Sequence, residues 1–471
     1  MTNKIRTRTA PSPTGFFHIG NARTALFNFL FAQQNGGKFF LRIEDTDIER
    51  SKKIYEDNIV DGLKWLGLNW DGEIIRQSER TAVYKKYLNK LLDEQKAFYC
   101  FHTQDELKEE QKEQKLNKLS YQHNCDHKNL TETKIKARKN EGSIIRLINS
   151  NKRIIFNDMV RDEMVFESEL LGDLSLAKDI DNPLYNFAVV VDDEEAQISH
   201  VIRGEDHLSN TPKQILIREA LGFEQPRYAH LPLILGADRS KLSKRHGGTA
   251  LTEYRDQGYL PTAMINFMAL LGWHPVHNQE IFSLEELIKE FDLKKAQKGG
   301  AAFDINKLDS INSHYIKQLS NDVLADKLKP YLKEFNLNPG QLEKIARSFK
   351  DRLKNFSEIK TLCSDIFNLA DYSADLLVWK NSDKKTAAAN LETAKKIILK
   401  IADDRFDLDC VTTDLMTAAE ERGRGEFLWP LRTALSGSEK SPSPFELINI
   451  LGQQESIVRI NSAIQKLHNL I

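Results

Sequence analysis

The fold is decided by residues 5–23, IRTRTAPSPTGFFHIGNAR, and by residues 37–47, GKFFLRIEDTD. The first stretch has the pattern of a β-strand, a turn rich in Pro and Gly, and a helix whose apolar spacing continues to residue 35. The second stretch contains the short apolar run 39–43, which is typical of a buried strand. The sequence therefore predicts a βαβ unit, in which the helix crosses between two parallel strands.

The rest of the chain predicts several further regions around this unit. Residues 185–191 and 199–203 are rich in β-forming side chains and indicate a second α/β stretch, whereas amphipathic helical spacing dominates after about residue 250. We expect an α/β region at 1–97, an inserted domain at 98–182, a second α/β region at 183–250, a helical region at 251–325 and an all-helical domain at 326–471.

The composition excludes several classes of protein. The chain has 471 residues, 40% of them hydrophobic, and 67 Lys and Arg stand against 68 Asp and Glu, a balance that fits neither a disordered chain nor a membrane protein. Four cysteines in so long a chain do not make a disulfide framework. We expect a folded protein of the cytoplasm with no membrane partner. The net charge of −1 leaves nucleic-acid binding to local clusters of cations.

The first chemical motif, PTGFFHIGN at residues 13–21, places two glycines and a histidine where the first strand gives way to a helix. Open α/β sheets bind ligands at this position, and the N-terminus of a helix favours the phosphates of a nucleotide. The glycines match neither the Walker nor the dinucleotide-binding pattern. His18 is a candidate donor to phosphoryl charge, and a capped helix with an incidental histidine is the alternative.

The second motif, KLSKRHGG at residues 241–248, gathers three cations and two glycines in one loop. Lysines on such a loop can close over a polyphosphate and stabilise charge that develops in the transition state. A basic surface turn is the alternative interpretation. The first motif, about 220 residues upstream, favours a phosphate-binding loop over this alternative.

Taken together, RTAPSPTGFFHIGNARTALFN, GGKFFLRIEDTD and KLSKR resemble the glutamyl-tRNA synthetases of bacterial type, a family of class I aminoacyl-tRNA synthetases. His18 to Asn21 is similar to the HIGH signature, with Asn at its fourth position, and KLSKR is similar to the KMSKS loop. The resemblance implies that 1–97 and 183–250 are the two halves of an α/β catalytic domain with a Rossmann-like parallel sheet. It also implies that 98–182 binds the acceptor end of tRNA, that 251–325 contacts its stem, and that the all-α domain 326–471 binds the anticodon.

The same resemblance implies a glutamate–tRNA ligase. Such an enzyme activates L-glutamate with ATP and Mg²⁺ as glutamyl adenylate, and transfers it to the 2′-hydroxyl of the terminal adenosine of tRNA(Glu). We expect a monomer that needs tRNA before it activates glutamate, with His18, Lys241 and Lys244 as catalytic residues. The ATP-binding residues that the resemblance implies are Pro13, Gly15, His18, Gly20, Asn21, Lys241, Ser243 and Lys244.

A pocket for glutamate needs cations for the carboxylates and an anion for the ammonium group. The resemblance implies that Arg8 pairs with the side-chain carboxylate and that Ser12 and Glu44 hold the amino group. An ion pair between Arg8 and Glu44 is the purely structural alternative. Val189 stands where some relatives carry Asn, which removes one amide from the pocket. The complete implied set is Arg8, Ala10, Ser12, Glu44, Tyr185 and Arg203, with Tyr185 in a strand.

Two short Cys-x-His pairs indicate a metal site in the insertion. Two Cys and two His can complete a tetrahedral structural Zn²⁺ site, which would stabilise a small segment that lacks a core of its own. Unliganded Cys and His in a polar segment is the alternative, and His123 lies nearby. We expect Cys363 and Cys410 to be buried packing residues. The predicted ligands are Cys100, His102, Cys125 and His127.

The segment 344–360 is strongly basic. The resemblance implies that Arg352 contacts an anticodon base, and a solvated basic helix is the plainer interpretation. Glutaminyl-tRNA synthetase is the nearest alternative, but its anticodon-binding part is a β-barrel. An HxGH-type adenylyltransferase and an inactive tRNA-binding paralogue are further alternatives. The helical last third argues against the first, and the intact His18 and loop lysines argue against the second.

Overall fold

The computed structural model describes residues 4–119, 121–138, 141–242, 250–369 and 371–469. The chain divides into two compact units, which we call the first and the second unit. The first consists of Met1–Arg255 and Pro261–Leu308, and the second of Asp256–Leu260 and Asp309–Ile471. The division falls within the helix α11, Ile305–Gln318, and so within the region 251–325. Among the described helices, none combines the length and the apolar character that crossing a bilayer requires.

The predicted βαβ unit is present at the start of the chain. The strands β1 (Arg6–Thr9) and β2 (Lys38–Ile43) pair in parallel, and the helix α1 (Ile19–Gln34) connects them. The short strand β3 (Ile75–Arg76) extends this sheet in parallel on the other side of β2. A β-carbon at Gly37 would lie 2.3 Å from the carbonyl oxygen of Ile5, so only glycine fits between the helix and the second strand.

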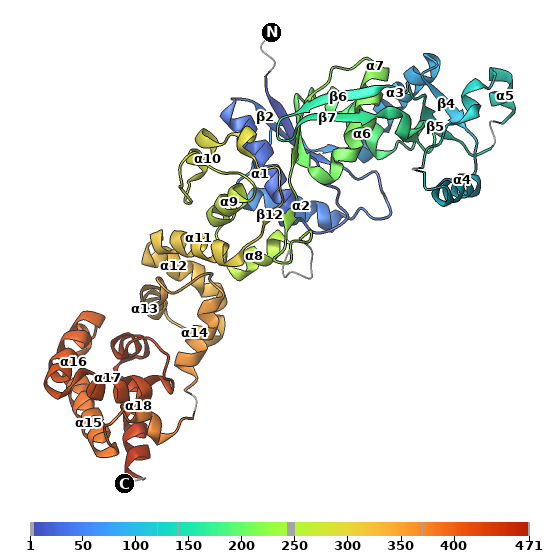
Figure 1. The fold of residues 1–471 in the computed structure, drawn as a ribbon. Helices are drawn as coiled ribbons and strands as arrows, with labels where there is room; N and C mark the ends of the chain where they lie inside the picture. Colours follow the sequence, from blue (N-terminus) through green and yellow to red (C-terminus); the bar gives the residue numbers. More distant parts are fainter. Residues whose placement is uncertain (1–3, 120, 139–140, 243–249, 370, 470–471) are drawn as a thin grey trace. The chain divides into compact units, whose positions relative to one another are not determined.

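A second sheet in the order β7-β6-β10-β9 joins two parts of the chain that are distant in sequence. The strands β9 (His200–Gly204) and β10 (Arg227–Leu231) are parallel, and β6 (Arg153–Asp158) continues the sheet beyond β10. The backbone N–H of Ser199 donates to Arg6, which sets the start of β9 beside β1. The hairpin of β6 and β7 (Asp162–Glu167), which lies within 98–182, thus belongs to the same sheet as the second α/β stretch (Figure 1).

The remainder of the insertion forms a small antiparallel sheet and a polar helix. The strands β4 (Ala97–Cys100), β5 (Ile144–Leu147) and β8 (Leu174–Ala177) make up the sheet. The helix α4 (Gln104–Leu116) has no buried residue, and a capping box between Thr103 and Glu106 begins it. This charged segment is therefore a solvated helix.

One secondary-structure prediction is wrong. Residues 185–191, expected as a strand, belong to the helix α6 (Tyr185–Glu195). The residues from Phe187 to Asp193 are all buried, so the helix has no exposed face in this part and its sequence carries no amphipathic period. Three consecutive valines favour a strand by local propensity, but burial on every side decides the conformation instead. The helix α7 (Thr211–Leu221) packs against α6.

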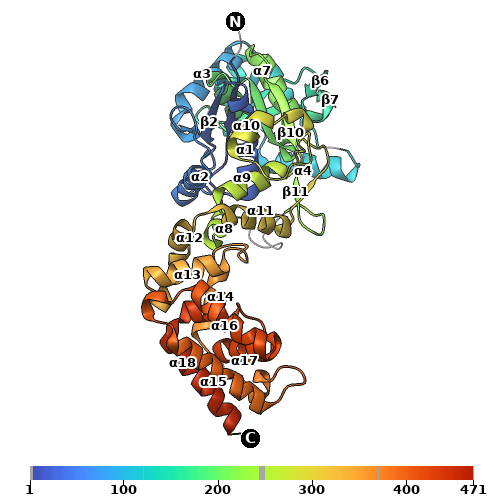
Figure 2. The same ribbon diagram turned by 90° about the vertical axis from the view of Figure 1, so that its left-hand side faces the viewer.

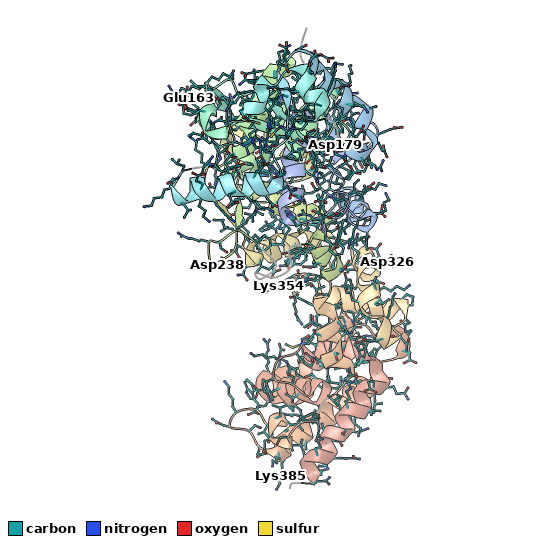
Figure 3. All side chains as sticks on the ribbon, turned by 90° about the vertical axis from the view of Figure 1, so that its right-hand side faces the viewer. Glu163, Asp179, Asp238, Asp326, Lys354 and Lys385 are labelled. Atoms are coloured by element: carbon teal, nitrogen blue, oxygen red, sulfur yellow. The ribbon has the colours of Figure 1, made fainter. Side chains whose placement is uncertain are left out.

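The first unit contains further elements around these sheets, and the described part of the second unit is entirely helical (Figures 1 and 2). Cys363 is buried, as predicted, whereas Cys410 is partly exposed, because it lies in the first turn of α16. Exposed charges such as Asp326 and Lys385 project from the second unit (Figure 3). The other elements of the first unit are α2 (Lys53–Trp65), α3 (Thr81–Asp93), α5 (Glu132–Ala137), α8 (Leu251–Gln257), α9 (Pro261–Leu270), α10 (Leu284–Glu290), β11 (Ile234–Leu235) and β12 (Ala301–Ala302). Those of the second unit are α12 (Asn321–Leu328), α13 (Pro339–Phe349), α14 (Glu358–Phe367), α15 (Lys384–Lys400), α16 (Leu408–Arg422), α17 (Arg424–Ser436) and α18 (Pro444–His468).

Candidate active site

A cavity of about 440 Å³ lies in the first unit, where the carboxyl ends of β1, β2 and β9 meet the N-terminus of α1. Open α/β sheets bind their ligands at this edge. Ser12, Pro13 and Gly15 do not line the cavity, and Ser243 and Lys244 lie outside the described residues. The predicted residues that do line it are Arg8, Ala10, His18, Gly20, Asn21, Glu44, Tyr185, Arg203 and Lys241.

His18 caps the helix that faces this cavity. Its Nδ1 accepts hydrogen bonds from the backbone N–H groups of Gly20, at 3.1 Å, and of Asn21, at 3.3 Å. An Nδ1 that accepts carries no proton, so the single ring proton is on Nε2 and is free to be donated. Desolvation in the cavity lowers the pKa of His18, and the nearby Lys241 ammonium lowers it further. His18 therefore caps α1 through Nδ1 and can donate a hydrogen bond through Nε2, so the two interpretations of this histidine are compatible.

The second motif begins beside His18. Lys241 lines the cavity, and its Nζ lies 3.2 Å from a carboxylate oxygen of the exposed Asp206. An exposed ion pair of this kind is worth little, so the ammonium can exchange its partner for a phosphate at small cost. Asp206 lies two residues after Gly204. A β-carbon at Gly204 would lie 2.5 Å from the Asp206 carboxylate, so a larger residue there would displace this carboxylate.

The end of the cavity that Arg8 and Glu44 line rests on a buried ion network. Asp193 on α6 accepts from Nε of Arg8 at 3.0 Å and from Nη1 of Arg42 at 2.6 Å. Arg42 also pairs with Glu44 at 3.0 Å, so the proposed alternative of an Arg8–Glu44 ion pair gives way to Arg8–Asp193 and Arg42–Glu44. Burial alone would raise the pKa of Asp193, but Arg8 and Arg42 hold it well below its ordinary value. Burial raises the pKa of Glu44, against the effect of Arg42.

Asp192, the neighbour of Asp193, anchors α6 on its other side. Its carboxylate accepts from Nε2 of Gln77 at 2.8 Å, Nε of Arg80 at 2.7 Å and the hydroxyl of Tyr84 at 2.9 Å. Its charge is matched by Arg80 at 2.7 Å, and Nε of Arg42 also lies 3.9 Å from its Oδ2. This acidic pair could not be predicted from the sequence, because VVVDDEEA has the local pattern of a strand that runs into a solvated turn.

Arg203 lies at the end of β9 and lines the same cavity. Its guanidinium is buried, and among the described residues its Nη1 has no hydrogen-bond partner. The hydroxyl of Tyr185 lies 3.2 Å from Nδ1 of His207, and both residues line the cavity. Desolvation and the charge of Arg203 lower the pKa of His207 to about 4, so this imidazole is neutral at pH 7. A buried guanidinium nitrogen without a partner beside a cavity is a ready site for a carboxylate.

The insertion holds a separate cluster of thiols and imidazoles. Cys100, His102, His123 and Cys125 bring one ligand atom each within 4.8 Å of one another. The Sγ of Cys100 lies 3.4 Å from Nδ1 of His102 and 3.5 Å from Nε2 of His123, and the Sγ of Cys125 lies 3.5 Å from Nδ1 of His102. Sulfur and nitrogen ligands around a tetrahedral zinc ion are separated by about 3.5 Å, given the usual bond lengths. The cluster therefore has the spacing of a zinc site.

The predicted ligand His127 has a weaker position than His123. It lies in an overlapping group with His102, Cys125 and Asp126, but its Nδ1 accepts from the backbone of Phe101 and its Nε2 faces Arg138 at 3.1 Å. In contrast, Nδ1 of His123 contacts the carboxylate of Glu110 at 2.7 Å, the usual arrangement behind a metal-bound imidazole. The group around Cys100 thus contains His123, whereas the two Cys-x-His pairs of the sequence predict His127.

A second cavity, of about 310 Å³, lies within the second unit. Arg352, Arg432 and Lys440 bring positive charge to its wall, and Asp365 is the acidic side chain there. Arg352 is half exposed, and its guanidinium lies 3.1 Å from Glu446 and 5.8 Å from the ring of Phe349. The structure thus places Arg352 at a cationic hollow that is large enough for a nucleobase.

The fold and the cavity are those of a nucleotide-binding α/β enzyme with a separate helical unit. Comparison with known proteins identifies the family. The chain belongs to the class I tRNA synthetases of the E and Q type, whose catalytic domain matches residues 4–310, and an anticodon-binding domain matches residues 323–464.

Curated relatives match over the whole chain. The glutamate–tRNA ligase of Natranaerobius thermophilus is 42% identical and that of Aquifex aeolicus 40% identical, with 99% or more of each chain covered. Among solved structures, a glutamate tRNA ligase of Elizabethkingia meningosepticum in complex with its amino acid has a TM-score of 0.88 at 34% identity, over 98% of this chain and 100% of the other.

Proposed function

We propose that this protein is a glutamate–tRNA ligase, and the charge balance of the cavity carries the proposal. The charged groups at its amino-acid end are the guanidiniums of Arg8, Arg42, Arg80 and Arg203 against the carboxylates of Glu44, Asp192 and Asp193. One positive charge is left over. Glutamate has a net charge of −1 and compensates it, whereas glutamine is neutral and leaves it unpaired in a buried site. This favours the glutamate enzyme over the glutamine enzyme.

The residues of the cavity suit adenylate formation. The α-carboxylate of glutamate attacks the α-phosphorus of ATP, the bond to the β-phosphate breaks, and pyrophosphate leaves. Nε2–H of His18 and the ammonium of Lys241 can donate to the phosphate oxygens where negative charge accumulates, at the positive end of the α1 dipole. Lys244 and Ser243 of the same motif keep the ATP-binding roles that the resemblance implies. Mg²⁺ bound to ATP would offset the charge of the triphosphate.

In the second step the 2′-hydroxyl of the terminal adenosine of tRNA(Glu) attacks the acyl carbon, and AMP leaves. For tRNA we propose that the cationic hollow at Arg352 takes an unstacked anticodon base, because unpaired bases are read by Arg and Lys beside apolar rings. Replacing Arg352 by Ala should weaken tRNA(Glu) binding, whereas the same change at the exposed Arg424, outside the hollow, should leave it unaltered. A monomeric state and a cytoplasmic location stay predictions.

We propose a structural Zn²⁺ held by Cys100, His102, His123 and Cys125. The ion would join β4 to the loop before β5 in a part of the insertion whose apolar core is small. Native mass spectrometry of protein purified without chelator should find one zinc ion per chain. His123→Ala should lose the ion and His127→Ala should keep it. Zinc retained in His123→Ala and lost in His127→Ala would restore the ligand set of the sequence analysis.

Glutamate-dependent exchange of pyrophosphate into ATP, with and without tRNA(Glu), tests the main proposal. We expect exchange with glutamate and tRNA together. Exchange that responds to glutamine alone would assign the protein to the glutamine enzymes. Intact tRNA binding without exchange under any condition would indicate the inactive paralogue, and exchange that needs neither amino acid would indicate a different adenylyltransferase.

A further inference from the structure

Behind the cavity, Arg203 is the first member of a buried chain of hydrogen bonds that crosses three strands. Its Nε lies 3.2 Å from Nε2 of His230, which pairs with it in register on β10. Its Nη2 donates to the hydroxyl of Thr211 at 2.8 Å, and that hydroxyl lies 2.9 Å from the same Nε2. Nδ1 of His230 then lies 2.6 Å from the carboxylate of Asp158 at the end of β6. All four side chains are buried.

The chemistry of the donors fixes the proton positions along this chain. The Nε–H of Arg203 can only donate, so Nε2 of His230 must accept, and the ring proton must be on Nδ1, where it is donated to Asp158. The hydroxyl of Thr211 accepts from Arg203 and donates to His230. Burial and the charge of Arg203 agree with this, because they lower the pKa of His230. Burial alone would raise the pKa of Asp158, but the hydrogen bond from His230 lowers it.

These hydrogen bonds occupy one edge of the Arg203 guanidinium and leave another edge unused. Nε and Nη2 are held by His230 and Thr211, while Nη1 is buried and, within the described residues, has no partner. Two anchors on different elements, β10 and α7, fix the plane of the group before any ligand arrives. An arginine that is already immobile does not lose rotamer entropy on binding, so its hydrogen bonds to a carboxylate contribute more to affinity.

We propose that Thr211, His230 and Asp158 are positioning residues for glutamate recognition, which hold Arg203 so that Nη1 meets a carboxylate of the amino acid. This inference rests on the proposed function. None of the three lines the cavity, so they act through Arg203 and do not touch the substrate.

Asp158 also links this series of hydrogen bonds to the insertion. Its Oδ1 accepts from the backbone N–H groups of Val160 and Arg161, both at 3.0 Å, and of His230 at 3.2 Å. The first two bonds close the turn between β6 and β7, whose outer strand carries the exposed Glu163 at the margin of the unit (Figure 3). One carboxylate therefore holds both the hairpin and, through His230, the arginine of the pocket.

Thr211→Val tests the proposal with the least disturbance, because valine keeps the shape and removes the hydroxyl. In pyrophosphate exchange with tRNA(Glu), the KM for glutamate should rise roughly tenfold, which is the usual effect of losing one hydrogen bond to a charged group. The KM for ATP should stay within about twofold, since ATP occupies the other end of the cavity. Thr211→Ser restores the hydroxyl and should restore the glutamate KM.

His230 supplies an independent pair of variants. His230→Gln keeps an acceptor for Arg203 and a donor for Asp158 and should stay close to the wild type, whereas His230→Leu should raise the glutamate KM at least as much as Thr211→Val. Thr433→Val is the matched control, because that buried hydroxyl bonds only within α17 in the second unit.

A purely structural role would give a different pattern. Thr211→Val and His230→Leu would then lower the urea midpoint and the fraction of active enzyme while the glutamate KM stayed at the wild-type value, and that result would overturn the proposal. A wild-type protein without glutamate-dependent exchange would instead overturn the proposed function, so the two failures are distinguishable.

Discussion

Replacing Asp193 by Asn removes the charge that holds two buried guanidiniums in place. Asp193 receives three hydrogen bonds, two from Arg8 at 3.0 and 3.4 Å and one from Arg42 at 2.6 Å, and its side chain is 5% exposed. The amide of Asn keeps one acceptor and turns an N–H donor toward a cation. Because breaking a buried pair strands its partner, we expect the first unit to lose about 3–5 kcal/mol of stability at pH 7.

Urea-induced unfolding, followed by circular dichroism and tryptophan fluorescence, measures this loss. Asp181→Asn is the matched control, since its ion pair with Lys85 spans 3.1 Å between half-exposed side chains and should contribute less than about 1 kcal/mol. The pKa of Asp193 is depressed, so its contribution is complete above about pH 4 and is lost as the pH falls through the folded-state pKa. The deficit of the variant should therefore shrink in acid. An Asp193→Asn protein as stable at pH 7 as Asp181→Asn would refute the network as a source of stability.

Two further changes probe residues that line the cavity. Gly20→Ala places a β-carbon 3.0 Å from the His18 ring, so the ring must move. We expect pyrophosphate exchange to fall about tenfold while the stability of the protein stays unchanged. Gly142→Ala is the control and should be neutral, because its β-carbon would meet no atom within 4 Å. Burial raises the pKa of Glu44, the carboxylate that we expect to hold the ammonium group of glutamate. The KM for glutamate should therefore rise as the pH is lowered from neutrality and Glu44 is protonated. In Glu44→Gln the KM for glutamate should be high and should no longer follow this titration.

The part of the site that the sequence could predict is the part carried by local pattern. His18 and Gly20 lie where a turn meets a helix, and the run from Phe39 to Glu44 shows both a strand and the charge at its end. Asp193 could not be found in this way, because its partners Arg8 and Arg42 are more than 150 residues away in the sequence. A carboxylate between apolar residues and a charged turn has no local sign of the guanidiniums that make it stable in the core.

The zinc cluster shows the same limit at shorter range. The Cys-x-His spacing predicts that a metal site exists near Cys100 and Cys125, but which histidine completes it depends on the path of the chain between them. His123 reaches Cys100 because Glu110, on the solvated helix α4, holds its other nitrogen, and His127 is drawn instead to the backbone of Phe101. Spacing alone cannot rank two histidines four residues apart.

The conformation of residues 185–195 decides more than secondary structure. In the helix, Tyr185, Val189 and Asp193 follow one another four residues apart and lie along one face. Eight residues of helix span about 12 Å, whereas eight residues of strand span about 26 Å. Only the helix lets Tyr185 line the cavity while Asp193 holds Arg8 at its base. Val189 between them offers no hydrogen bond, so this face contributes shape and an anchored charge, and the polar recognition of the amino acid depends on Arg8, Glu44 and the fixed guanidinium of Arg203.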